Sequence, residues 1–470
     1  MIKEIINLPL RFSRFLHILK EKEYIALFHS LTIETVFLSA RALELVSEFK
    51  TGKNISYIIM QKELDFSEKK SFFSLVERLI EFKMLVPLSC NEGKELNGYQ
   101  KNYLRNPVIN MAYLVLTDAC NLRCRYCFVR QDIDTKYNFS FMSSGVVRQS
   151  LNFFAKWTSE SVSKNKTVIL YGGEPLLNKE AFCLAIKHMH ILKKKKLLPE
   201  DLEISVITNG TLIDRNIASF MKDYNVLVGI SVDGMPKVND EYRCFPGGNG
   251  SFKKTRTGCE TLKSVGVEFS LSITITPSSV KNLLKHVQWL IEKFEPKGIG
   301  LNLLMDSAER IISSSEYAEI ATKEMIRCFE FLRENGIHEN RMMRKIDSFV
   351  DKKIYPYDCG GCGRQVVFLP SGEVGMCQAY ILSKKFFSIP DSKFSPYTNN
   401  DFIGWAKRSP LTMPQCLDCI VLGICGGGCP ARADFRHGSI LALDDIFCIH
   451  AKETLKWMIN DLYRYESEEG

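Results

Sequence analysis

The sequence predicts an α/β protein built around a parallel barrel or partial barrel of six strand-and-helix units. Between about residues 110 and 335, apolar strand-like runs alternate with stretches of helical periodicity, as in a parallel sheet with crossover helices. Polar motifs follow several of these runs directly, and the active site of such a fold lies at the carboxyl ends of its strands. Distant parts of the chain are therefore expected to converge on one end of the sheet.

The expected strands are, in chain order, MAYLVLT, TVILY, EISVIT, LVGISV, FSLSITIT and GIGLNLLM. Each is followed by a plausible helix, and the first three helices are expected near residues 143–157, 179–193 and 214–223. The fold thus supplies a physical reason for residues far apart in the sequence to share one site.

Length and composition fit a large globular protein of two to four domains. The chain has 470 residues, of which 45% are hydrophobic and 25% charged, enough to bury more than one core. The net charge of +8 is modest for this length, and the lysine run 193–196 lacks interleaved aromatic residues, so neither predicts nucleic-acid binding.

Cysteine usage points to a reducing compartment. The amino-terminal segment lacks a signal-peptide pattern, and no run approaches the roughly 20 apolar residues of a membrane span. Sixteen cysteines in such a chain favour metal ligation over a disulfide framework. We therefore expect a cytoplasmic protein that does not bind a membrane.

The most specific motif is a cysteine triplet directly after the first expected strand. Cys120, Cys124 and Cys127 lie in LTDACNLRCRYCF with the spacing C-x3-C-x2-C. Three thiolates at this pitch can hold three irons of a 4Fe-4S cube and leave the fourth iron open to a small chelating molecule. On its own, the triplet is also compatible with a zinc site or a disulfide.

The triplet resembles the motif of radical S-adenosylmethionine (radical SAM) enzymes, in which SAM is expected to occupy the open iron. The segments TVILYGGEPLL, EISVITNGTL and LVGISVDG resemble family segments at the matching strand ends. The resemblance implies a partial (β/α)6 barrel over residues 108–345. It also implies SAM contacts from Gly172, Gly173, Glu174, Thr208, Asn209, Ser231, Asp233 and Arg243.

A second set of cysteines follows the barrel, in residues 346–470. It resembles the SPASM extension, which in radical SAM enzymes carries two auxiliary 4Fe-4S clusters. The resemblance implies one cluster on Cys359, Cys362, Cys377 and Cys429, and another on Cys416, Cys419, Cys425 and Cys448. Zinc ribbons are the alternative, because tetrahedral zinc also uses C-x2-C pairs. The cysteines outside these sets are expected to be buried apolar residues, namely Cys90, Cys183, Cys259 and Cys328. Cys244 is the exception, because it follows Arg243 in the loop where the resemblance implies an arginine for the SAM carboxylate.

The first 90 residues read as a winged-helix-like domain of two strand-like runs, three helices and a closing strand. They contain 13 Lys or Arg and 11 Asp or Glu, which is not the excess of basic residues that marks a DNA-binding surface. The segment resembles the recognition element of enzymes that mature ribosomally synthesised, post-translationally modified peptides (RiPPs). Such domains hold a leader peptide as an added strand. Residues 91–107, rich in Asn, Gly and Lys, are expected to form a linker.

Together, the resemblances imply a radical SAM maturase of a precursor peptide. Cleavage of SAM would give a 5'-deoxyadenosyl radical that abstracts a substrate hydrogen, and the expected product is a thioether or carbon–carbon crosslink. The implied cofactors are SAM and three 4Fe-4S clusters, with a flavodoxin or ferredoxin as electron donor. No catalytic base is identified.

Two alternatives predict different functions. Anaerobic sulfatase maturases form formylglycine, but that family has an aspartate where this chain has Gln378 and a glutamine where it has Tyr171. A non-catalytic iron–sulfur or zinc regulatory protein is the alternative from another class, and it predicts no SAM binding.

Overall fold

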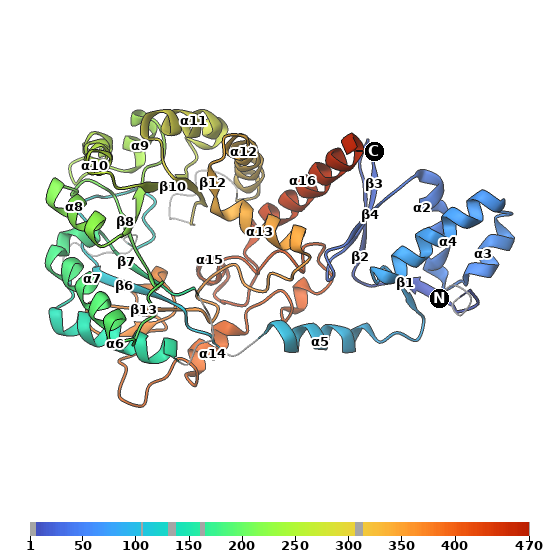
Figure 1. Ribbon diagram of the computed structural model, residues 1–470, viewed down its shortest axis with the longest axis horizontal. Coiled ribbons are helices and arrows are strands. Elements are labelled where there is room, and N and C mark those ends of the chain that lie inside the picture. Colours follow the sequence, from blue (N-terminus) through green and yellow to red (C-terminus); the bar gives the residue numbers. More distant parts are fainter. Residues whose placement is uncertain (1–5, 105–106, 130–137, 160–164, 306–313, 470) are drawn as a thin grey trace.

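A nine-stranded, mostly parallel sheet forms the centre of the protein. The computed structural model describes residues 6–104, 107–129, 138–159, 165–305 and 314–469 (Figure 1). The strand order is β12-β11-β10-β9-β8-β7-β6-β13-β14, so the six expected strands lie side by side in chain order. These are β6 (Met111–Thr117), β7 (Thr167–Gly172), β8 (Glu203–Thr208), β9 (Leu227–Ser231), β10 (Phe269–Ile275) and β11 (Gly298–Leu303). The prediction of a central parallel sheet is confirmed.

Helices cover the outer face of this sheet. In chain order they are α6 (Ser144–Ser159), α7 (Lys179–Lys194), α8 (Arg215–Asp223), α9 (Pro236–Tyr242), α10 (Phe252–Val265), α11 (Leu283–Phe294) and α12 (Ser314–Glu334) (Figure 1). Strand alternation separates the two faces. In β10, Phe269, Leu271, Ile273 and Ile275 are buried, whereas the intervening side chains are small and polar. On β10, the helices therefore bury an apolar face and leave a polar inner face.

Both ends of the sheet are extended by strands beyond the six. Next to β11 lies the short parallel strand β12 (His338–Glu339). Next to β6 lies β13 (Gln365–Phe368), which is parallel to β6 and forms a hairpin with β14 (Val374–Gly375). The cysteine-rich segment thus contributes strands to the barrel sheet itself. Among the described residues, β12 and β14 pair with no further strand, so the sheet is open.

The rest of the carboxyl-terminal segment consists largely of turns and short helices. It contains α14 (Asn400–Ala406) and α15 (Pro430–His437), and it ends in the long helix α16 (Asp445–Glu469). This last helix packs against α12 and α13 (Asn340–Asp351) and runs toward the amino-terminal domain (Figure 1). Five 3-10 turns complete the described elements: η1 (Glu48–Thr51), η2 (Pro175–Asn178), η3 (Val280–Asn282), η4 (Gln378–Tyr380) and η5 (Pro414–Cys416).

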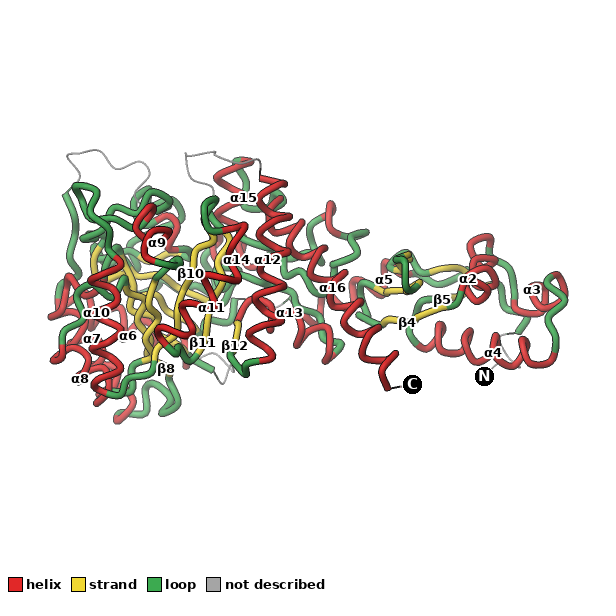
Figure 2. The backbone as a smooth tube through the Cα atoms, turned by 90° about the horizontal axis from the view of Figure 1, so that it is seen from above, coloured by secondary structure: helices red, strands yellow, loops and turns green. Residues whose placement is uncertain are grey.

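The amino-terminal domain lies at the far end of an elongated molecule (Figure 2). The expected strands and helices are present as β3 (Ile25–His29), β4 (Thr35–Leu38), α2 (Ala40–Ser47), α3 (Ile55–Gln61), α4 (Phe66–Glu81) and β5 (Leu85–Pro87). Two further strands were not expected: β2 (Leu16–Lys20) completes the antiparallel sheet β2-β3-β4, and β1 (Leu10–Phe12) pairs with β5.

The segment expected to link the amino-terminal domain to the barrel, residues 91–107, is mostly a helix. Helix α5 spans Glu92–Tyr103, and its cap Asn91 accepts a hydrogen bond from the Lys94 amide. Its apolar side chains Leu96, Tyr99 and Tyr103 pack against the core described in the next paragraph. Capping and tertiary packing thus outweigh the unfavourable composition. Residues 105 and 106 lie outside the described residues.

The sheet β2-β3-β4 has a hydrophobic core on each face. Leu27 and Val36 belong to a core shared with α2, α3 and α4. Phe28, on the other face of β3, belongs to a second core with side chains of α13, α16 and the cysteine-rich loops, and its ring stacks on Phe349 with centroids 6.4 Å apart. The amino-terminal domain is therefore anchored to the carboxyl-terminal segment by buried apolar surface.

We predict that Phe28→Ala destabilises the protein by about 3–5 kcal/mol, because it empties a fully buried site between the two segments. Urea unfolding followed by tryptophan fluorescence measures the change. Phe66→Ala is the matched control, since this ring is 87% exposed and its loss should change stability by less than about 0.5 kcal/mol. Equal losses in the two variants would contradict the anchoring role.

Candidate active site

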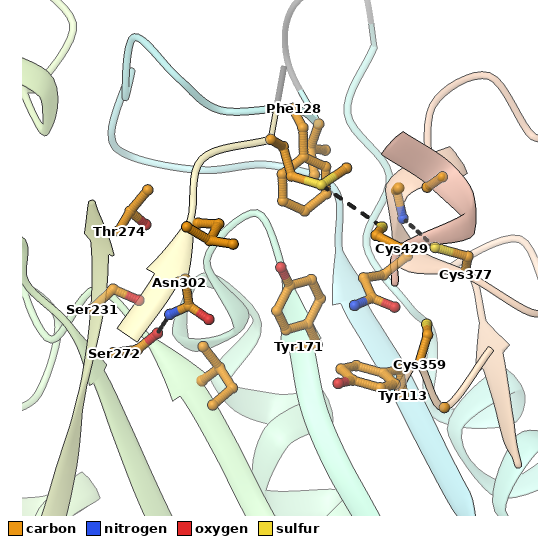
Figure 3. Close-up of a pocket in the computed structure, with 18 of the residues that line it drawn as sticks. Tyr113, Phe128, Tyr171, Ser231, Ser272, Thr274, Asn302, Cys359, Cys377 and Cys429 are labelled. Atoms are coloured by element: carbon orange, nitrogen blue, oxygen red, sulfur yellow. Dashed lines mark hydrogen bonds between the residues drawn. The ribbon is translucent and has the colours of Figure 1, made fainter. Parts of the chain in front are cut away.

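A cavity of about 940 Å³ lies at the carboxyl ends of the parallel strands (Figure 3). Strand ends, the loop after β6 and the cysteine-rich segment all contribute to its wall. In Figure 3, Ser231, Ser272, Thr274 and Asn302 lie on one side and Cys359, Cys377 and Cys429 on the other, with Tyr171 between them. The convergence expected at this end of the sheet is therefore present.

The cysteine triplet lines this cavity. Cys120, Cys124 and Cys127 are each half-buried in the loop that follows β6. Burial raises the pKa of Cys124 to about 12, and the neighbouring thiols Cys127 and Cys120 add to the shift, although the Arg243 guanidinium opposes it. The Leu122 amide lies 3.4 Å from Cys120 Sγ and can donate to it. Three neighbouring thiols in one loop, of which Cys124 is costly to ionise alone, fit a metal centre, which supplies the missing positive charge.

Two glycines bring this loop against the end of β7. The amide of Gly173 donates to Thr117 O at 2.9 Å. A Cβ added to Gly172 would lie 2.2 Å from Thr117 O, and one added to Gly173 would lie 2.3 Å from Ala119 O. The glycines of the GGEP turn are therefore required for a close approach of two backbone segments within the protein. They also line the cavity.

Glu174 joins the ends of β7 and β8. Its carboxylate accepts hydrogen bonds from Thr208 Oγ1 at 2.6 Å, the Asn209 amide at 2.8 Å and the Leu176 amide at 3.1 Å. Burial raises the pKa of Glu174, while these donors oppose the shift. Thr208 and Asn209 line the cavity, whereas Glu174 is fully buried behind it. A direct SAM contact from its side chain stays a prediction.

Asp233 and Arg243 are linked through a tyrosine of the cysteine motif. Tyr126 donates to Asp233 Oδ2 at 2.5 Å and accepts from Arg243 Nη1 at 2.6 Å. Arg243 and Ser231 line the cavity, whereas Asp233 is fully buried and accepts a further bond from the Thr274 amide. These hydrogen bonds fix the cysteine loop to the ends of β9 and β10. A SAM contact from Asp233 also stays a prediction.

The second cysteine set separates into the two groups expected from the sequence. The thiols Cys359, Cys362, Cys377 and Cys429 interact electrostatically with one another, and all but Cys362 line the cavity. The Ala379 amide lies 3.4 Å from Cys377 Sγ, and the Arg432 amide lies 3.5 Å from Cys429 Sγ. Amides aimed at sulfur suit ligating thiolates. The first group therefore fits a cluster site on the wall of the same cavity.

The second group lies away from the cavity. Cys416, Cys419, Cys425 and Cys448 are electrostatic neighbours, and none of them lines the cavity. Within the described ranges, no three Cys, His, Asp or Glu side chains converge closely enough for a single metal ion. The assignment of the cysteines to particular clusters stays a prediction.

The cysteines outside the sets were predicted only in part. Cys259 and Cys328 are buried, as expected. Cys90 and Cys183 are half-buried, so the prediction that they are buried is wrong, and Cys244, the expected exception, is also half-buried. Cys244 Sγ donates to Arg123 O at 3.4 Å, which ties its loop to the cysteine motif.

Several residues of the cavity wall were not singled out from the sequence. They are Tyr113, Ser272, Thr274, Asn302, Arg341, Arg344, Asp358, Arg364 and Arg432. For Ser272, Thr274 and Asn302, the polar positions that alternate with buried apolar ones near the ends of β10 and β11 were the available signal. Arg341 and Arg344 come from a segment without a motif, whereas Arg364 and Arg432 follow Cys362 and Cys429 closely, and only the fold brings all four to the cavity.

An open parallel α/β sheet with a cysteine triplet at the carboxyl end of its first strand defines the class of radical SAM folds. Residues 114–290 match the family model of the Radical SAM superfamily. The chain therefore contains a radical SAM domain, and the resemblance inferred from its motifs is confirmed.

Similar proteins extend this comparison beyond the domain. The radical SAM cyclopropyl synthase TigE of Paramaledivibacter caminithermalis is 21% identical over 475 residues, 96% of each chain. The cysteine-type anaerobic sulfatase-maturating enzyme of Clostridium perfringens is 26% identical over 372 residues, 75% of this chain and 96% of that one. The solved structure of native anSMEcpe with bound AdoMet shares the fold with a TM-score of 0.64 and 21% identity, covering 77% of this chain and 100% of that one.

A search of the described helices for a long, apolar membrane span finds none.

We predict that Gly173→Ala lowers stability by about 1–3 kcal/mol, because the new methyl group must push the cysteine loop away from β7. The variant should also take up less iron on anaerobic reconstitution. Thermal unfolding and iron analysis measure the two effects. Gly300→Ala in β11 is the control, since an added Cβ there meets nothing within 4 Å. Normal iron uptake by Gly173→Ala would show that the close approach is dispensable.

Proposed function

We propose that this protein is a radical SAM enzyme that installs a thioether or carbon–carbon crosslink in a ribosomally synthesised precursor peptide. The observation that carries the proposal is the single cavity lined both by Cys120, Cys124 and Cys127 and by a second group of thiols. A crosslink formed by hydrogen abstraction leaves one surplus electron, and a redox centre beside the reacting atoms can accept it. The similarity to TigE along 96% of both chains supports the same class of activity.

The residues of the cavity fit the cofactors that this chemistry needs. The cysteine triplet would hold a 4Fe-4S cluster, and the two groups of four thiols would hold two auxiliary clusters. When bound, the first cluster and SAM supply a carbon-centred radical. Gly172, Gly173, Thr208, Asn209 and Ser231 offer backbone and polar contacts for SAM, and Arg243 offers a cation for its carboxylate. A small reduced flavodoxin or ferredoxin is the proposed electron donor.

The remaining wall can position a substrate and keep water out. Tyr113 and Tyr171 meet edge to face with ring centroids 5.5 Å apart, at the side of the cavity next to Cys359 and Cys377 (Figure 3). Phe128, Leu304 and Met305 contribute apolar surface. Apolar walls restrict the entry of water and dissolved reductants, and so protect a reactive intermediate in the cavity from side reactions.

The amino-terminal domain offers an edge strand for the precursor peptide. His29 pairs with Glu34 through its amide, so the alternation of an antiparallel ladder directs the Thr35 and Phe37 amides away from β3. Apart from the ladder bonds of the sheet, neither amide donates a backbone hydrogen bond within the described part of the chain. Strand β4 (TVFL) carries no charge, whereas the other edge, β2, ends in the exposed Lys20, a residue type that discourages pairing. We therefore place the leader peptide along β4.

Formylglycine formation is the second candidate, because the sulfatase-maturating enzyme covers 75% of this chain. Gln378 lines the cavity beside Cys377, and its Oε1 lies 3.3 Å from Gln365 Nε2. A carboxamide cannot act as a base. Crosslink formation is favoured because it does not require a base at that position.

We predict that Cys124→Ala abolishes the formation of 5'-deoxyadenosine from SAM in reduced protein. Cys425→Ala should retain this uncoupled cleavage but bind about four irons fewer than the roughly twelve of the wild type, because it removes a ligand of one auxiliary cube. Chromatography of the nucleoside and iron analysis measure both results. Cys183→Ala, outside the sets, is the control. Wild-type protein that binds only zinc would refute the proposal.

We predict that Thr35→Pro weakens the binding of a precursor peptide encoded beside this chain by about tenfold, since proline removes an outward amide from β4. Fluorescence anisotropy of the labelled peptide measures the affinity. Thr35→Val keeps the amide and removes a hydroxyl that has no hydrogen-bond partner within the described ranges, so it should bind normally. The same affinity in both variants would place the peptide elsewhere.

A further inference from the structure

Four cations share one carboxylate on the cavity wall beside the first auxiliary thiols. Asp358 lies 3.7 Å from Arg344 Nη2 and 3.9 Å from Lys345 Nζ. Burial acts to raise the pKa of Asp358, but Lys345, Arg344, Arg341 and Arg364 together hold it below its ordinary value. One carboxylate compensates four positive charges only in part.

Most of the buried or half-buried cations near the cavity have an acidic neighbour of their own. Arg432 contacts both oxygens of Asp444 at 3.1 Å, and Arg243 lies beside Asp233. Arg364 lies next to the thiol of Cys359, and Lys345 lies next to that of Cys425. A thiol that ligates a metal carries a negative charge, so Arg364 and Lys345 each have a negative partner.

Arg341 is different. Its Nε and Nη2 donate to Asn302 Oδ1 at 3.3 and 2.8 Å, which is a neutral acceptor. Among the described residues, no carboxylate oxygen lies within 4 Å of its guanidinium, and its Nη1 donates no hydrogen bond. Because a guanidinium carries five donors in a planar fork, part of that fork is left for another acceptor in the cavity.

Asn302 holds this guanidinium in place at the end of β11. Its Nδ2 donates to Ser272 Oγ at 3.0 Å and to Ile273 O at 3.2 Å, so its Oδ1 is turned toward Arg341 (Figure 3). A cation oriented by a fixed neutral partner pays little conformational entropy when it binds an anion.

We infer that Arg341, with Arg344 beside it on α13, binds a carboxylate of the substrate segment that enters the cavity. The inference rests on the proposed function and adds the substrate class: the segment to be modified carries an aspartate or glutamate side chain, or ends in the peptide's own carboxylate. Arginine binds carboxylates through two parallel hydrogen bonds, which gives both affinity and orientation. The bound residue would be fixed at the carboxyl end of β11, on the wall shared with Asp358.

The test uses three N-acetylated pentapeptides that differ only in their acidic group. One has a central glutamate and an amidated end, one has a central glutamine and an amidated end, and one has a central glutamine and a free carboxyl end. Isothermal titration of the reconstituted full-length protein should show about tenfold tighter binding for one carboxylate peptide than for the neutral peptide. Which of the two it is identifies the source of the carboxylate.

Arg341→Gln should remove this preference and Arg341→Lys should reduce it, because lysine keeps the charge but loses the fork. Arg327→Gln, at a side chain that is 59% exposed on α12, should keep it. Equal binding of the three peptides to the wild type, including no binding at millimolar concentration, overturns the inference. So does an Arg341→Gln variant that loses SAM affinity while keeping the peptide preference, since the arginine would then serve SAM.

Formation of 5'-deoxyadenosine without peptide separates this inference from the proposed function. Its absence in the wild type defeats the proposed function whatever the peptides do. Normal formation together with equal peptide binding defeats only the carboxylate site.

Discussion

The close backbone contact between the cysteine loop and the end of β7 determines the geometry of the site. Two hydrogen bonds, from the Gly173 amide to Thr117 O and from the Glu174 amide to Ala119 O, fix the loop to the sheet before any side chain is considered. Glu174 then ties the same turn to the end of β8. Asn209 Nδ2 donates back to Asn121 Oδ1 at 2.9 Å, within the cysteine loop, and so closes a ring of contacts. The position of the triplet is thus set by contacts among three backbone segments, and not by the C-x3-C-x2-C spacing alone.

This ring of contacts is made by motifs at the strand ends, which explains why much of the site could be predicted from the sequence. The parallel order of β6 to β11 follows from apolar runs alternating with amphipathic helices, and the motifs at the strand ends are short and local. Assigning Glu174 and Asp233 to SAM contacts goes beyond what such motifs fix. A buried carboxylate that accepts several protein donors and one that faces a ligand look the same in a sequence, because both need the same residue type at the same strand end.

Other parts of the fold could not be predicted from local sequence patterns. Helix α5 has the polar composition of a loop, and its formation depends on a core built by residues more than 300 positions away, such as Leu411 and Val421. The pairing of β13 with β6 joins the cysteine-rich segment to the barrel sheet, and a run as short as QVVF gives no hint of its partner. Likewise, the roles of the arginines on the cavity wall depend on their neighbours in the fold, which the sequence does not show.

Charge distribution follows from the same arrangement. Isolated buried arginines are costly, yet Arg243, Arg364, Arg408 and Arg432 all lie next to thiols of the three cysteine groups. Clusters ligated by several thiolates are net negative, and nearby cations stabilise their reduced forms. Arg341 departs from this pattern because its hydrogen bonds within the described residues go to the neutral Asn302 side chain. The difference between these arginines therefore lies in their surroundings and not in the residue type, and this difference underlies the carboxylate site proposed above.

The amino-terminal domain is linked to the second thiol group by backbone as well as by apolar packing. The Gly423 amide donates to Ser30 O at 2.8 Å, in the turn between β3 and β4, and an added Cβ at Gly423 would lie 2.6 Å from that oxygen. Gly423 sits in the loop between Cys419 and Cys425, and its carbonyl accepts from the Tyr355 amide at 2.7 Å, near Asp358. In the proposed function, a peptide on β4 would be bound to a sheet whose turn contacts the loop between Cys419 and Cys425 directly and the cavity wall through one further residue, Tyr355. The spacer between the leader and the modified segment would then have to match the distance from β4 to the cavity.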